Sequence, residues 1–259
     1  YASNSGLTPR SQSTASYQFS KSEGNYTMQS AIAGIGTACP ALYVKKEDAY
    51  EYMTSAFSMT KKERDLYERV LLNGPVQGRH IAMDEYADAL KTTPDELLAR
   101  FQRFGIDTAC DAARNAIEDA GICPGEVQAV VVNTCTGYLC PGFTSYVVEA
   151  LRLPPSTKVF DLMGMGCGGA VPNLECAAGL SIAVEICTAT LYMGEDPGLV
   201  VSNSIFADGA AAALLCNIEK APTAKNRLRL LEFQTVTAPE YRDDLRFESV
   251  EGRLRNKLS

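Results

Sequence analysis

The most informative stretch of the chain is DLMGMGCGGA, residues 161–170, in which an apolar run breaks into glycines around one cysteine and then becomes helical. A helix N-terminus presents free N–H groups and a partial positive charge, which lower the pKa of a thiol placed there. Glycines on either side let a bound thioester approach the backbone closely. Pro172 falls in the first helical turn, where its missing N–H costs little. The pattern predicts a nucleophilic Cys167 at a turn from strand to helix.

Two other interpretations of this stretch fit less well. A glycine-rich turn before a helix can bind phosphate, but the Lys-Ser/Thr pair that ends a P-loop is missing. The G-x-S-x-G register of hydrolases is not met either, because position 165 is Met. For Cys110, Cys176 and Cys216 we instead expect small, buried, apolar residues.

Apolar runs on both sides of this turn predict strands. Residues 127–133 (VQAVVVN) are almost continuously β-branched, which is typical of a strand covered on both faces. Residues 31–36 predict a short buried strand that ends in a glycine turn. Residues 181–192, 198–203 and 209–216 are strand or buried-helix candidates. Further strands are expected over 158–162 and 227–237, with a hairpin over 245–258 that turns at residues 251–252.

Helices alternate with these strands. Capping boxes that begin at Thr60 and Thr93 mark two helix starts, the second with Pro94 at the first helical position. Gly121 marks a helix end. Helical patterns cover 47–72, a segment from 94, 107–120 and 144–151. The alternation predicts an α/β layered fold with a mixed, mostly buried sheet.

Composition excludes several classes of protein. The 259 residues suit one large domain or two closely packed ones, and a net charge of −7 offers no basic surface for nucleic acid. No apolar run approaches the roughly 20 residues of a membrane-spanning helix. Nine cysteines in apolar or helical contexts suit reduced thiols, so we expect a cytoplasmic protein. One histidine and no CxxC pair argue against a metal site.

Several motifs, in order along the chain, resemble type III polyketide synthases, the chalcone synthase-like branch of the thiolase superfamily. The specific ones are CTGYLCPG (135–142), GMGCGG (164–169) and SIFADGAAA (204–212), joined by EICTAT (185–190) and by the residue pair 79–80. The resemblance covers about residues 28–259. It implies a thiolase-like layered α-β-α fold, mainly its N-terminal half.

The resemblance also implies an activity and its residues. Cys167 would take a starter acyl group from CoA, and malonyl-CoA would then be decarboxylated and condensed with it; no cofactor is implied beyond these thioesters. Phe206 matches a gatekeeper between the CoA tunnel and the cavity, while Thr190 and Cys135 match cavity-lining positions. Cys140 matches a residue that crosses a homodimer interface. Arg69 matches a CoA-binding position, although with Lys61, Lys62 and Arg64 nearby the alternative is a solvated helix face.

The sequence also departs from this family. The catalytic histidine and asparagine and the GFGPG-type loop of its C-terminal half are not found, and about ten residues fewer than in relatives follow Gly179. His80 matches no catalytic position, so we expect a structural role. We interpret 1–27 as a flexible extension, 28–238 as the N-terminal thiolase-like domain and 239–259 as the start of the C-terminal half. The hypothesis is that these residues are part of a longer enzyme.

Two alternatives remain open. One is a catalytically silent thiolase-fold protein that binds acyl-CoA or a partner subunit. The other is a condensing enzyme of the ketoacyl-ACP synthase III or thiolase type, which shares the cysteine turn but fits residues 135–142 and 204–212 less well.

Overall fold

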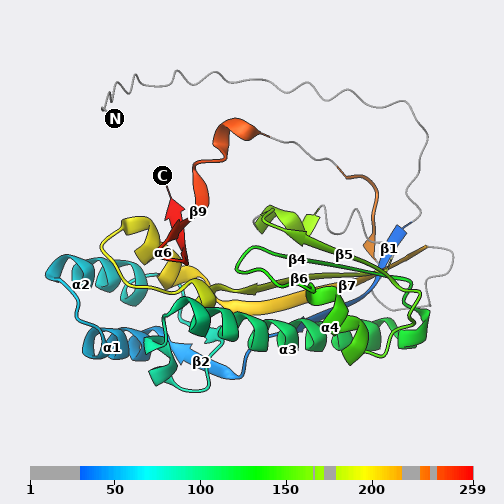
Figure 1. Ribbon diagram of the computed structural model, residues 1–259, viewed down its shortest axis with the longest axis horizontal. Coiled ribbons are helices and arrows are strands. Elements are labelled where there is room, and N and C mark those ends of the chain that lie inside the picture. The colour runs from blue at the N-terminus through cyan, green and yellow to red at the C-terminus, as the bar shows by residue number, and fades with distance from the viewer. Residues whose placement is uncertain (1–29, 166, 172–178, 218–227, 234–237, 259) are drawn as a thin grey trace.

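The computed structural model describes residues 30–165, 167–171, 179–217, 228–233 and 238–258 (Figure 1). Its main sheet has six strands in the order β5-β4-β6-β7-β1-β8. β4 runs parallel to β5 and β6, and the other neighbours are antiparallel, so the predicted mixed sheet is confirmed. The strands are β1 (Ser30–Ala38), β2 (Leu42–Lys45), β3 (Gly78–Ile81), β4 (Ala129–Thr134), β5 (Lys158–Met163), β6 (Leu180–Ile186), β7 (Asp208–Asn217), β8 (Leu228–Arg229), β9 (Leu245–Val250) and β10 (Arg253–Leu258).

Helices cover one face of this sheet. Figure 1 shows α3 and α4 lying along that face, with α1 and α2 beyond the end of the sheet where β2 lies. The α-helices are α1 (Lys46–Ala56), α2 (Lys61–Tyr67), α3 (Pro94–Ala120), α4 (Phe143–Ala150) and α6 (Pro197–Ile205). The short π and 3-10 helices are η1 (Glu68–Leu72), η2 (Tyr86–Leu90), η3 (Pro124–Glu126), η4 (Cys167–Gly169), η5 (Cys187–Thr190) and η6 (Pro239–Tyr241).

The longest helix corrects one prediction. The two helices expected from residue 94 and over 107–120 are a single 27-residue helix, α3. Both ends were predicted correctly: the Thr93 side chain accepts from the Glu96 N–H, and Gly121 ends the helix at φ 67°. Nothing stops the helix between them, because Gly105 is buried against the Phe143 ring, where an added Cβ would lie 2.8 Å from Cζ. Packing against α4 thus offsets the low helix propensity of Gly105, and α3 continues past this residue.

The length of strand β1 differs from a second prediction. The expected glycine turn at residue 36 is wrong, because the strand continues to Ala38. Gly34 and Gly36 instead let β1 approach α3 closely: a Cβ on Gly36 would lie 2.2 Å from the Ala112 carbonyl oxygen. The sheet and its longest helix are therefore in near backbone contact at these positions.

The main core lies between the sheet and helices α3 and α4. β4 is buried along its whole length, as the β-branched run predicts, and Val130, Val131 and Val132 are fully inaccessible. β5, at the sheet edge, is more open than the predicted mostly buried sheet, since Phe160 is 52% exposed.

Three segments were expected to be either strands or buried helices, and two of them are strands. Residues 181–186 and 209–216 lie in strands β6 and β7, whereas 198–203 lie in α6. Of the strand expected over 227–237, only Leu228–Arg229 is strand among the described residues. The hairpin of β9 and β10 is confirmed, with Glu251 and Gly252 at φ 52° and 78° in its turn.

Some predictions fall outside the described residues. These are the extension at 1–27, the first helical turn with Pro172, and Cys176. Among the helices that the structure does describe, none has the length and apolar character needed to cross a membrane.

Candidate active site

Cys167 lies just beyond the end of β5, where the chain turns back toward the sheet. Gly164 makes the turn with φ 74°, and its N–H donates to the Thr134 carbonyl at the end of β4. Cys167 then begins the short helix η4 and is exposed. Gly169, at the end of η4, faces Asn133 of β4, where a Cβ would lie 3.3 Å from the amide nitrogen. The cysteine is thus held at the carboxyl ends of two parallel strands.

A carboxylate lies beside the end of β4. Glu185 of β6 accepts hydrogen bonds from the Cys135 N–H at 3.0 Å, the Thr136 N–H at 3.1 Å and the Thr136 hydroxyl at 2.8 Å. The Cys135 thiol also donates to it, at 3.2 Å. These donors fix the segment that follows β4, because one carboxylate satisfies both of its first backbone N–H groups.

Three thiols share this region. Burial, followed by the charge of Glu185, raises the pKa of Cys135. Burial, followed by the charge of Asp208, raises the pKa of Cys187. The turn that carries Cys167 reaches the same strand end, because the Gly164 N–H donates to the carbonyl of Thr134, the residue before Cys135. The structure therefore brings the predicted nucleophile and the predicted cavity residue Cys135 together.

A cavity of about 80 Å³ opens next to this group, and Thr190, Phe206 and Cys187 are among the residues that line it. Its walls come from α1, β2, β3, η2, η5, α6 and β10. Apolar and aromatic side chains dominate them, including Met53, Phe57 and Leu191. The predicted gatekeeper Phe206 and the predicted cavity residue Thr190 thus share one apolar space. Cys135, the other predicted cavity residue, is not among the residues that line it.

The partly buried Arg79 and the buried Asp208 hold the wall that carries Phe206. The Arg79 Nη1 donates to the carbonyls of Asn203 at 2.6 Å and Phe206 at 2.8 Å. The Asp208 carboxylate accepts from the Ala82 N–H at 2.5 Å and from the Thr188 N–H and hydroxyl at 2.9 and 2.6 Å. Burial raises the pKa of Asp208 despite these donors. Asp208 thus holds the start of β7 against Ala82 and Thr188.

Arg69 and Cys140 lie apart from this cavity. Arg69 is exposed and lines, with Lys61, Lys62, Asp65 and Leu66, an open hollow of about 510 Å³ on α2 and η1. Cys140 is exposed and lines neither space. His80 is in β3, where its Nδ1 lies 2.7 Å from the Pro40 carbonyl oxygen and its ring packs edge-on against Tyr43, in keeping with a structural role.

Sequence reasoning missed Glu185, Cys187, Arg79 and Asn256 as members of the site. Glu185 had a usable signal, because a carboxylate inside the apolar run SIAVEI must find donors when it is buried. Asn256 had none, since it stands in the charged run RLRNK near the end of an expected strand. In the described part of the chain, no group of three or more His, Cys, Asp or Glu side chains is arranged to hold a metal ion.

Comparisons with known proteins bear on this geometry. A family model described as "FAE1/Type III polyketide synthase-like protein" matches residues 41–254. The 3,5-dihydroxyphenylacetyl-CoA synthase of Streptomyces toyocaensis is 25% identical over 232 residues, which are 84% of this chain and 58% of that protein. The chain therefore spans little more than half the length of this relative.

Solved structures show the same fold. A type III pentaketide synthase from Neurospora crassa superposes with a TM-score of 0.77 at 21% identity, covering 90% of this chain and 67% of that one. CsyB, solved in complex with CoA-SH, superposes with a TM-score of 0.74 at 20% identity and covers 89% of this chain and 68% of that one.

Proposed function

Because the chain belongs to the FAE1/type III polyketide synthase-like family, we propose that Cys167 accepts an acyl group from a CoA thioester and holds it for condensation with malonyl-CoA. The observation that carries this proposal is the exposed Cys167 at the glycine turn after β5, next to an apolar cavity. The complex of CsyB with CoA-SH supports CoA thioesters as the class of substrate.

The proposed loading step needs few groups. The Cys167 thiolate attacks the thioester carbonyl, a carbon–sulfur bond forms, and the bond to the CoA sulfur breaks, so that CoA leaves as a thiolate and takes up a proton. In the condensation, malonyl-CoA loses CO₂ and its carbanion displaces the Cys167 sulfur from the acyl group. The carbanion needs groups that stabilise its charge. The imidazole of His80 does not take this role in the proposal, because it lies in β3 and contacts the Pro40 carbonyl.

The other predicted site residues would bind parts of the substrate or lie at an interface. Thr190 and Phe206 would bound the space for the acyl chain. Arg69, with Lys61 and Lys62, would bind the CoA phosphates in the hollow on α2, because basic side chains around an open hollow favour anions. Cys140 would lie at a homodimer interface, as the resemblance implies, and its exposure supports this assignment.

The test is acyl transfer to Cys167. The protein is incubated with hexanoyl-CoA, and intact mass and peptide mapping locate the adduct. We expect a hexanoyl adduct on Cys167 that Cys167→Ala abolishes without loss of the fold, because an exposed small side chain is replaced by another. Cys123→Ala, which removes another exposed thiol, is the matched control and should load normally.

Equal loading of Cys167→Ala would refute the assignment. Release of CO₂ from malonyl-CoA tests the condensing step separately. A stable adduct on Cys167 without that release would favour the alternative of a silent acyl-CoA-binding protein.

A further inference from the structure

Asn256 of β10 is an unusual member of the cavity wall. The residue is 6% exposed, and its side-chain Oδ1 is buried with no hydrogen-bond partner. Of the described residues that line the cavity, it is the one with such an atom. A buried acceptor without a donor is unfavourable in a folded protein, so a retained one calls for a partner.

Several polar groups of the cavity wall are already engaged. The Thr190 hydroxyl donates to the Cys187 carbonyl at 2.9 Å, and the Thr188 hydroxyl donates to Asp208. The Asn203 amide donates to the Tyr67 hydroxyl at 2.8 Å. These donors are used within the wall, so a donor on a bound molecule would supply the missing partner of Asn256.

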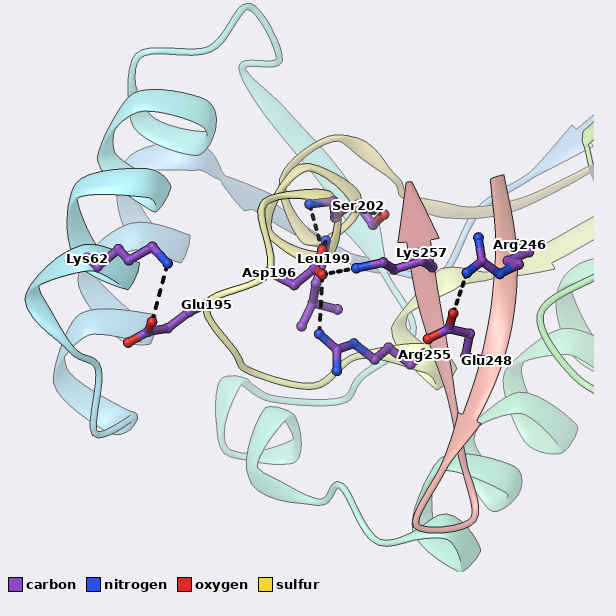
Figure 2. A network of polar contacts seen from close by, with 10 residues as sticks. Lys62, Glu195, Asp196, Leu199, Ser202, Arg246, Glu248, Arg255 and Lys257 are labelled. Carbon is purple, nitrogen blue, oxygen red and sulfur yellow. Dashed lines mark hydrogen bonds and ion pairs between the residues drawn. The ribbon is translucent and has the colours of Figure 1, made fainter. Parts of the chain in front are cut away.

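The fold holds Asn256 firmly in place. Its strand pairs with β9, where Asn256 lies opposite Phe247. The residues on either side, Arg255 and Lys257, both form ion pairs with Asp196 before α6, as Figure 2 shows. Asn256 also lies beyond residues 41–254, the span that the family model matches.

We propose that Asn256 determines substrate specificity: its Oδ1 accepts a hydrogen bond from a hydroxyl group on an apolar acyl chain bound in the cavity. This inference rests on the proposed function, in which the acyl group enters this cavity. The cavity is small, at about 80 Å³, so the group that it binds should be short. Apolar walls with one acceptor that lacks a hydrogen-bond donor suit a short alkyl or aryl group that carries a hydroxyl.

The test compares matched pairs of thioesters. Rates of Cys167 acylation are measured with 6-hydroxyhexanoyl-CoA against hexanoyl-CoA and with 4-hydroxybenzoyl-CoA against benzoyl-CoA, so that alkyl and aryl carriers of the hydroxyl are distinguished. We expect a preference of roughly fivefold for the hydroxylated member of at least one pair. Asn256→Leu, of similar size, should abolish this preference, and Asn256→Asp, which keeps an acceptor, should retain it.

Controls separate this inference from the proposed function. Leu254→Ala alters an exposed residue of the same strand outside the cavity and should keep the preference. Shifts of the melting temperature with the four thioesters are also measured in a Cys167→Ala background, so that Asn256 is tested even if no acyl group is transferred. An absent preference in the unmodified protein, or one that survives in Asn256→Leu, overturns the inference. Failure of all four thioesters to acylate Cys167 counts against the proposed function alone.

Discussion

Cys110, Cys135 and Cys187 are kept in the thiol form by their surroundings. Burial raises the pKa of Cys110 to about 11, and burial with nearby carboxylates raises the pKa of Cys135 and of Cys187. At neutral pH these groups are protonated and poorly nucleophilic. Cys167, in contrast, is exposed, on a turn that is hydrogen-bonded to the residue before Cys135. The pattern supports one nucleophile among neighbouring cysteines.

Glu185→Gln should make Cys135 more reactive. Desolvation and the Glu185 carboxylate both raise the pKa of this thiol, so removing the charge lowers the pKa while the effect of burial remains. The pH profile of Cys135 alkylation by iodoacetamide, followed by peptide mapping, should therefore move to lower pH. Glu118→Gln, at an exposed position on α3, is the matched control and should leave the profile unchanged. An unmoved profile in Glu185→Gln would exclude the carboxylate as a cause.

At the scale of elements, the contact between β1 and α3 determines how the sheet meets its longest helix. A Cβ on Gly34 would lie 2.3 Å from the Ala116 carbonyl oxygen, and one on Gly36 would lie 2.3 Å from the Ala116 nitrogen. Helix backbone cannot move aside as a flexible side chain can, so any larger residue must displace α3. Ala112, Ala116 and Ala120 are themselves nearly inaccessible, which keeps the interface close on the helix side.

Gly36→Ala should lower the free energy of unfolding by roughly 1–3 kcal/mol, because overpacking forces the backbone of α3 away from β1. Urea denaturation followed by circular dichroism measures this change. Gly125→Ala is the matched control: nothing lies within 4 Å of its added Cβ, and the expected change is within about 0.5 kcal/mol. A Gly36→Ala protein as stable as the control would mean that α3 is not packed so closely.

At the scale of the molecule, one carboxylate connects the C-terminal hairpin to the body of the fold. Asp196 accepts from the Gly198 and Leu199 N–H groups at the start of α6, at 2.9 and 3.2 Å. Its other oxygen lies 2.5 Å from the Lys257 ammonium and 3.4 Å from the Arg255 guanidinium of β10 (Figure 2). The hydrogen bond from Lys257 lowers the pKa of Asp196. The helix that leads to Phe206 and the strand that carries Asn256 thus share one anchor.

Asp196→Ala should loosen this junction. It removes a helix cap worth about 1 kcal/mol and leaves two partly buried cations without their partner, so we expect a loss of roughly 2 kcal/mol. Hydrogen exchange should rise in α6 and in β9 and β10 more than in α3. Glu195→Ala, which removes an exposed carboxylate that pairs with Lys62 and is hydrogen-bonded to the Thr60 side chain, should cost at most about 1 kcal/mol. Equal exchange in both variants would show that the hairpin is held by other contacts.

Much of the local structure follows from neighbouring residues. The helix starts at Thr60 and Thr93, the helix end at Gly121 and the hairpin turn at 251–252 were all predicted correctly, because their hydrogen bonds join residues three to five apart. The resemblance is confirmed by the family model over residues 41–254, since it rests on short motifs that can be read without coordinates.

By itself, the sequence determined the class of fold, the family and the cysteine turn. Only the tertiary structure decided that α3 is continuous, that Glu185 holds the segment after β4, and that Asn256 closes a cavity near Phe206. The physical reason is the distance along the chain: Glu185 and Cys135 are 50 residues apart, and their hydrogen bond exists because β6 and β4 pair in the sheet. Asn256 gains its neighbours because β10 packs on α6 and η5, far from it along the chain.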